Sequence, residues 1–221
     1  GGIGSVARYP QPANIDNVPS SQSLEMPEHL VDSAQLLINQ QLAETSGMPR
    51  YLEGARYWLQ YAGIPDSIYN YTDSRNDYTD DYSARGQWVN YLAGGSRVNP
   101  HQAGLGVPVH LSLAFHSDAG VKRNDTIIGT LMIYTDWDND KAKKYPTGVS
   151  RQAARDYGDY MQTQIVEDMR ALYTPHWMRR QLHNSSYSEA RLPKMPAVLL
   201  ELLSHQNYND MRYGLDPRVK F

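Results

Sequence analysis

The segment PAVLLELLS, residues 196–204, is an almost unbroken run of apolar residues. A short run of this kind is typical of a β-strand that is buried on both faces. A second strand is predicted in VPVHLSLAFHSDAG, where alternate apolar residues share one face: Val109, Leu111, Leu113 and Phe115. Further strands are predicted over residues 66–72 and 126–135.

Amphipathic helices are predicted between these strands. The ranges expected to be helical are 28–44, 49–62, 80–92 and 150–173, followed by a short helix from Asn207. Helices that alternate with buried strands predict an α/β fold, with a mixed, mostly parallel central sheet flanked by helices. Residues 1–27, rich in Gly, Pro, Ser and Asn, are expected to be a loop-rich segment before a single domain over residues 28–221.

Composition and charge exclude some classes of partner. The chain has 221 residues, 40% hydrophobic and 20% charged, with a net charge of −3 and no basic stripe, so nucleic acid is not an expected partner. No apolar run approaches the ~20 residues of a membrane span. The absence of cysteine excludes disulfides and thiolate metal sites. The chain opens at Gly1-Gly2, which looks like a cut or engineered start, so the missing signal peptide does not argue against export.

Three side chains occupy positions suited to chemistry. His116 is expected at the carboxyl end of a buried strand, where the ligand crevices of open α/β sheets lie. Glu201 stands among leucines, where a carboxylate is costly to bury without a partner or a function. Glu53 lies in the first turn of the helix expected over residues 49–62. A hydrogen-bonded structural histidine and a glutamate that complements a helix dipole are the alternative interpretations of His116 and Glu53.

The segments PVHLSLAFHSDAG and KMPAVLLELLSHQNYNDM carry a resemblance to a known family. The first resembles the strand and small polar turn in which zinc-dependent N-acetylmuramoyl-L-alanine amidases place a ligand histidine. The second resembles the amidase segment in which a proline leads into a buried strand with a catalytic glutamate. PRYLEGARYWLQYAG resembles the helix with the ligand glutamate, so that the resemblance covers residues 49–213. RYWLQYAGIPDSIY and DYTDDYSARGQWVNYL also resemble Bacteroidetes envelope proteins, some labelled xanthan lyase-like and carrying a golvesin-type module.

The resemblance implies Glu53 and His116 as zinc ligands and Glu201 as the catalytic acid/base. Zinc accepts such ligands, keeps one position for water and polarises the amide carbonyl, while a nearby glutamate moves the proton. The family's first ligand, a histidine in a Gly-His-Gly-Gly-like turn, has no counterpart here. His29 precedes Glu53 but is expected at a helix start. Other histidines that could substitute for it are His101, His110 and His205.

Two explanations of the missing histidine stay open: an upstream segment outside this chain, which would leave the fold incomplete at its N-terminus, or loss of the ligand in this lineage. On both, residues 1–221 alone are expected to bind zinc weakly or not at all and to have little amidase activity. The leading expectation for function is a periplasmic or secreted hydrolase domain that cuts the N-acetylmuramoyl-L-alanine amide bond of peptidoglycan, beside an upstream domain of the same protein. The alternatives are a degenerate, non-catalytic amidase fold that binds an envelope glycan or serves as a structural module, and a polysaccharide-processing, xanthan lyase-like protein.

Overall fold

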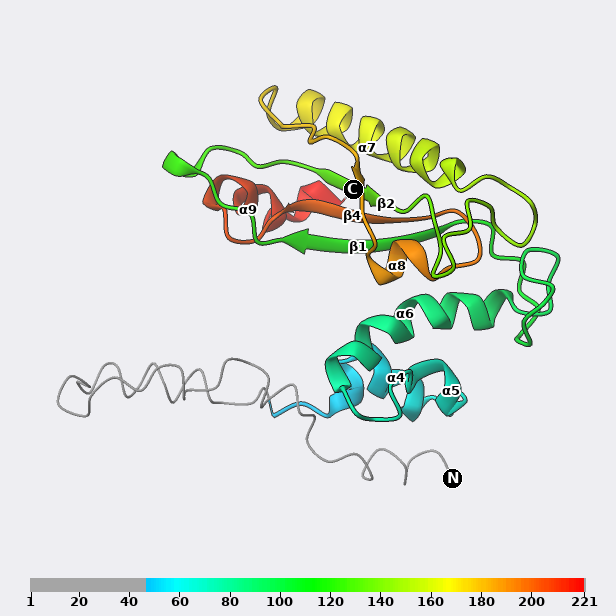
Figure 1. Ribbon diagram of the computed structural model, residues 1–221. Coiled ribbons are helices and arrows are strands. Elements are labelled where there is room, and N and C mark those ends of the chain that lie inside the picture. The colour runs from blue at the N-terminus through cyan, green and yellow to red at the C-terminus, as the bar shows by residue number, and fades with distance from the viewer. Residues whose placement is uncertain (1–46, 221) are drawn as a thin grey trace. The chain divides into compact units, whose positions relative to one another are not determined.

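The computed structural model describes residues 47–220, apart from the side chains of Arg123 and Lys220. The chain divides into two compact units, one up to Arg85 and one from Gly86 (Figure 1). The loop-rich segment expected over residues 1–27 and the helix expected over 28–44 lie outside the described residues. No helix within residues 47–220 has both the length and the apolar character needed to cross a membrane.

The described part of the first unit is helical. It contains η3 (Arg50–Leu52), α4 (Ala55–Tyr61), α5 (Asp66–Tyr69) and the beginning of α6 (Asp77–Ala93). The helix expected over residues 49–62 is interrupted, because Gly54 has an extended backbone and serves as the N-cap of α4.

The prediction of a strand over residues 66–72 is wrong, because residues 66–69 form the short helix α5. Pro65 occupies its N-cap and Asp66 its first turn, an arrangement that favours helix initiation and complements the helix dipole. Ile68 and Tyr69 are nevertheless buried. The apolar pattern therefore predicted burial correctly, whereas the proline and the aspartate decided the backbone conformation.

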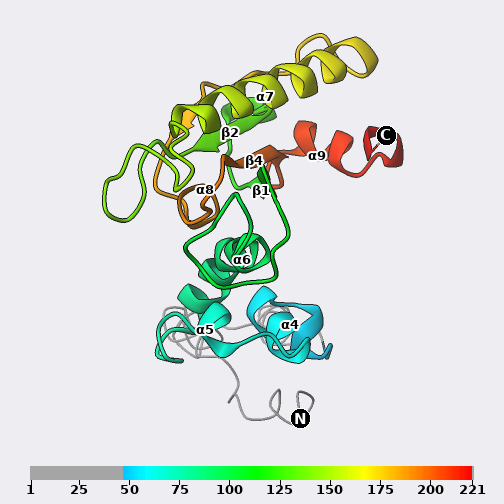
Figure 2. The same ribbon diagram turned by 90° about the vertical axis from the view of Figure 1, so that its right-hand side faces the viewer.

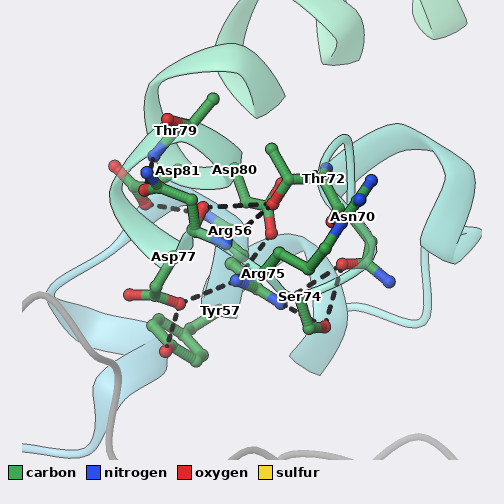
Figure 3. A network of polar contacts seen from close by, with 11 residues as sticks. Arg56, Tyr57, Asn70, Thr72, Ser74, Arg75, Asp77, Thr79, Asp80 and Asp81 are labelled. Atoms are coloured by element: carbon green, nitrogen blue, oxygen red, sulfur yellow. Dashed lines mark hydrogen bonds and ion pairs between the residues drawn. The ribbon is translucent and has the colours of Figure 1, made fainter.

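A buried ionic network holds the first unit together (Figure 3). The Arg56 side chain is 1% exposed, and its Nη1 lies 2.8 Å from Asp77 Oδ1 and 2.9 Å from Asp80 Oδ2. Its Nη2 donates to Ser74 Oγ at 3.0 Å. The Tyr57 hydroxyl donates to Asp77 Oδ1 at 2.6 Å, and burial, with help from Asp77, raises the pKa of Tyr57. The network joins α4, the following loop and α6 through paired charges.

The second unit is built on a four-stranded sheet with the strand order β1-β4-β2-β3. Its strands are β1 (Ser112–Asp118), β2 (Leu131–Tyr134), β3 (His183–Asn184) and β4 (Ala197–Ser204). The pairs β1–β4 and β2–β3 are parallel, and β2–β4 is antiparallel. The expected α/β fold with a mixed, mostly parallel sheet is therefore confirmed.

Helices cover the two faces of this sheet (Figures 1 and 2). The long helix α7 (Gln152–Leu172) packs on β2 and β4, where Met132, Val198 and Leu200 form a buried cluster. Gly158 permits the close approach of α7, because a Cβ there would lie 2.9 Å from Met132 Cγ. The short helix α8 (Ser188–Arg191) contacts β4 and β2 beside Glu201, whose side chain points to the opposite face from Leu200.

Strand β4 is buried along almost its whole length, as expected, but β1 is not a buried strand. β1 lies at an edge of the sheet, and its apolar side chains are exposed, Phe115 by 67% and Leu113 by 41%. The alternation predicted from the sequence is present. The prediction that β1 is buried is wrong, because α7 packs on the neighbouring strands β2 and β4 and leaves the apolar face of β1 exposed.

Polar side chains fasten the loops of the second unit to the sheet. Asp210 of α9 (Tyr208–Gly214) is fully buried, and its carboxylate accepts from the backbone N–H groups of Ile128, Gly129 and Ser204 at 2.9–3.0 Å. The Gln162 amide donates to the backbone oxygens of Thr130 and Arg180, each at 2.9 Å. These bonds satisfy buried backbone groups that would otherwise destabilise the fold.

The short helices η4 (Arg123–Asp125) and η5 (Pro217–Lys220) complete the described elements of the second unit. A second apolar cluster lies where α7, β4 and α9 meet. Its buried members are Val166, Met169, Trp177 and Leu203. The Trp177 Nε1–H donates to Thr130 Oγ1 at 2.9 Å, so that the large ring is both packed and hydrogen-bonded.

The ionic network of the first unit predicts a large effect of Asp80→Ala. This change removes one of the two carboxylates that pair with the buried Arg56 guanidinium. The free energy of unfolding should therefore fall by about 3–5 kcal/mol. Hydrogen exchange of peptides that cover residues 55–85 should then be much faster. Asp73→Ala is the control, because Asp73 pairs with Arg75 at the exposed surface. Equal hydrogen-exchange rates of residues 55–85 in the two variants would contradict the stabilising role of the network.

Gly129 predicts a second large effect on stability. Its φ is +77°, and a Cβ there would lie 2.1 Å from the carbonyl oxygen of Met178, so Gly129→Ala combines backbone strain with a backbone clash. We expect a loss of at least about 3 kcal/mol in the free energy of unfolding, measured by urea denaturation. Gly148→Ala is the matched control, since Gly148 has φ +85° and no atom within 4 Å of the added Cβ. It should lose only about 1–2 kcal/mol.

Candidate functional site

His116 and Glu201 lie next to each other on neighbouring parallel strands. They are register partners in the β1–β4 ladder, near the carboxyl ends of both strands. Side chains of register partners point to the same face, here the face that α8 covers. The structure therefore brings together two of the three site residues expected from the sequence.

Glu189 of α8 orients His116. The Nε2 atom of His116 lies 3.2 Å from Oε1 and 3.0 Å from Oε2 of Glu189. A carboxylate only accepts hydrogen bonds, so the ring N–H at Nε2 donates to Glu189. The side chain of His116 is partly exposed and that of Glu189 less so. A histidine held in this way by a carboxylate has a defined ring orientation and tautomer.

Glu201 is 9% exposed, and its Oε2 has no hydrogen-bond partner within the described residues. Burial raises the pKa of its carboxyl above the ordinary value of 4.5, and Asp118 and Glu189 add to this effect. His116 and Arg180 act in the opposite direction without cancelling it. Glu201 therefore keeps its proton to a higher pH than an exposed glutamate does, which suits a group that donates a proton.

A cavity of about 430 Å³ opens beside Glu201. Its polar lining comes from the end of β1, the segment after α7 and the N-cap of α8: Asp118, Arg180, Gln181, His183 and Tyr187. Leu131 and Ile133 of β2 form an apolar wall. Arg180 forms an ion pair with Asp118 through Nη1. The arrangement combines a buried carboxyl, a cation and an apolar surface in one concave site, as small-molecule sites commonly do.

A larger, mainly apolar groove of about 920 Å³ lies where β1, α7 and α9 meet. Its lining includes Phe115, Met169, Leu202 and Met211. Ser117 Oγ and His205 Nδ1 are 3.1 Å apart at this groove, and both side chains are exposed. His116 lines this groove, whereas Glu201 lines the smaller cavity together with Asp118 and Arg180. Because the smaller cavity contains the buried carboxyl, it is the better candidate for chemistry.

Glu53 belongs to the first unit, where it is the C-cap of η3. No group of three or more His, Asp or Glu side chains among residues 47–220 is arranged to hold a metal ion. Of the histidines considered as substitutes, His110 contacts Arg97 Nη2 at 3.0 Å, His205 contacts Ser117, and His101 is exposed in the loop after α6. His29 lies outside the described residues.

Comparisons with protein-family models, with curated proteins and with solved structures found no match.

Glu189, Arg180 and Tyr187 were not predicted from the sequence. All three lie in the segment 174–195, which has no clear periodicity. They reach the site because backbone bonds and a short helix place this segment against β2 and β4. Asp118 was visible as part of the turn after His116, but its ion pair with Arg180 spans 62 positions of the chain and has no local signal.

The raised pKa of Glu201 predicts how stability depends on pH. Between the ordinary value of 4.5 and the higher folded value, the folded state binds more protons than the unfolded chain, so this carboxyl makes stability fall as the pH rises. Glu201→Gln should remove that fall, so that the melting temperature of the variant relative to the wild type increases from about pH 4 to pH 8. The exposed Glu167→Gln serves as control. A difference in melting temperature between Glu201→Gln and the wild type that does not change with pH would contradict the raised pKa of Glu201.

Proposed function

We propose that the second unit is an amidase-like hydrolase domain of the cell envelope, which cuts the amide bond between the muramic lactyl group and L-alanine in peptidoglycan. The observation that carries the proposal is Glu201, a buried carboxyl with a partnerless oxygen and a raised pKa that lines a polar cavity. The substrate class and the periplasmic or secreted location rest on the resemblance of the two strand segments to the amidases.

The residues of the site suit the two proton transfers of amide hydrolysis. Water adds to the amide carbonyl and loses a proton, and the C–N bond breaks as the leaving nitrogen gains one. Glu201 holds its proton to a higher pH than usual and can donate it to the leaving nitrogen. His116, oriented by Glu189, is the neighbouring group that can accept the proton of the water. Groups with opposed tasks in one site are the usual arrangement for acid–base catalysis.

Zinc stays a prediction. When bound in such enzymes, it polarises the carbonyl and lowers the pKa of water. The Glu189–His116 pair fits the carboxylate–histidine arrangement that commonly supports a metal ligand. A catalytic zinc site, however, uses three protein ligands, and the described part of the chain contains no such group. The described residues therefore do not form a complete zinc site, and the proton transfers above involve side chains alone.

The same observation favours a second candidate, a non-catalytic module of amidase type that binds a cell-envelope glycan or peptide. Such a module would retain the cavity and its polar lining without turnover. The two candidates differ in one measurable respect, because only the first predicts release of free peptide from a muropeptide.

The direct test is hydrolysis of purified muropeptides by the full chain, with and without added zinc. The proposal predicts release of peptide with a new L-alanine N-terminus at a low rate, because the described residues do not form a complete zinc site. Zinc content is measured on the same samples. Glu201→Gln should lower the rate by about 10²–10⁴-fold, because an amide cannot transfer the proton. Glu167→Gln should leave the rate unchanged. His116→Ala should lower the rate and, if zinc is bound, the zinc content.

Turnover by Glu201→Gln at the wild-type rate would remove its assigned role. Binding of muropeptide without any release of peptide, with or without zinc, would favour the non-catalytic module. Stoichiometric zinc in the chain would show that a further ligand exists, and would make His110→Ala the next variant to test.

A further inference from the structure

Arg180 presents spare hydrogen-bond donors to the cavity beside Glu201. Its Nη1 is engaged by Asp118, while its Nε and Nη2 have no acceptor within the part of the chain that the structure describes. The side chain is 32% exposed, so solvent or a ligand can reach it. A guanidinium binds a carboxylate through two parallel N–H donors, and Nε and Nη2 form such a pair.

The backbone of Arg180 is fixed in place. Its N–H donates to the Thr130 oxygen at 3.0 Å, and its own oxygen accepts from Gln162 Nε2 at 2.9 Å. The ion pair with Asp118 then restricts the side chain. A donor pair held in this way loses little conformational entropy when a ligand binds, which favours selective recognition.

Three features of the cavity define what it would bind. Arg180 requires an acceptor with two oxygens, the buried Glu201 requires a polar group at its partnerless Oε2, and Leu131 and Ile133 offer a small apolar wall. An N-acylated amino acid or short peptide has all three: a carboxylate, an amide bond and an aliphatic side chain. A phosphate dianion fits less well, because Asp118 and Glu189 place negative charge close to the site.

We infer that Arg180 binds a carboxylate of the substrate, so that the cavity recognises an acylated amino acid or peptide whose free carboxylate lies close to the amide bond at Glu201. The inference deepens the proposed function, on which it rests, by assigning the substrate class and the specificity-determining residue. Arg180 holds the substrate and takes no part in proton transfer.

The test uses two small probes that differ only in charge, N-acetyl-L-alanine and N-acetyl-L-alaninamide. Their binding to the full chain is followed by NMR chemical-shift perturbation. The wild type should bind the carboxylate about tenfold to hundredfold more tightly than the carboxamide, the range expected for hydrogen bonds to a charged group. Arg180→Gln should abolish this preference while leaving weak binding of both probes.

Arg179→Gln is the matched control. Arg179 is the adjacent residue, has the same side-chain exposure of 32%, and pairs with Asp159 of α7 instead. It should keep the preference for the carboxylate. Arg180→Lys, which retains the charge and loses the planar pair of donors, should keep only part of it. This variant also provides a second measurement if Arg180→Gln does not fold.

Equal affinity of the wild type for the two probes would overturn the inference, and so would an unchanged preference in both Arg180 variants. Inorganic phosphate that binds more tightly than N-acetyl-L-alanine, and only when Arg180 is present, would replace the carboxylate by a phosphate ligand and overturn the assigned class. A carboxylate preference that depends on Arg180, in a chain that releases no peptide from muropeptides, would support the inference while the hydrolase proposal fails.

Discussion

Strand β4 is hydrogen-bonded to a neighbouring strand on each side and is buried along almost its whole length. Glu201 is the one residue of this strand that has a carboxyl group. Burial of its apolar side chains against α7 is the main favourable contribution that organises the second unit. Glu201 opposes that contribution, because a buried carboxyl oxygen without a hydrogen-bond partner destabilises the folded state. The fold therefore holds Glu201 in an unfavourable state, as functional sites often do.

Two buried ionic arrangements in this chain have different roles. Arg56 is surrounded by acceptors, and two carboxylates offset its charge. Because only 1% of its side chain is exposed, this network is closed to a ligand, and its role is to join elements of the first unit. Glu201 and Arg180 each retain atoms without a partner among the described residues, and both line the same cavity. Partly satisfied polar groups that face a cavity are typical of a binding site.

The position of Arg180 depends on bonds made far from the cavity. Gln162 of α7 bridges the backbone of residues 130 and 180, and Trp177 bonds to the Thr130 hydroxyl. Asp210 in turn holds the backbone at residues 128 and 129. An irregular segment can hold functional side chains in fixed positions only if its backbone groups are satisfied in this way. These polar contacts thus link the apolar core to the geometry of the site.

Local sequence patterns were sufficient to predict the class of the second unit and two residues of its candidate site, His116 and Glu201. Such patterns predicted the apolar strand at residues 196–204, the alternation in β1, the helix over residues 150–173 and the short helix from Asn207, and each element is present. The same local rules placed Glu201 in a buried strand. They misjudged residues 66–69, where a proline and an aspartate favoured a helix over the strand that the apolar pattern indicated.

Three features became known only from the three-dimensional arrangement: β1 is an edge strand, Glu189 orients His116, and Arg180 pairs with Asp118. Strand order, and hence which apolar face is covered, depends on contacts between residues far apart in the chain. The pairs 116–189 and 118–180 are likewise separated by long stretches of sequence. Periodicity and capping describe interactions within a few residues, so they carry no information about such pairs.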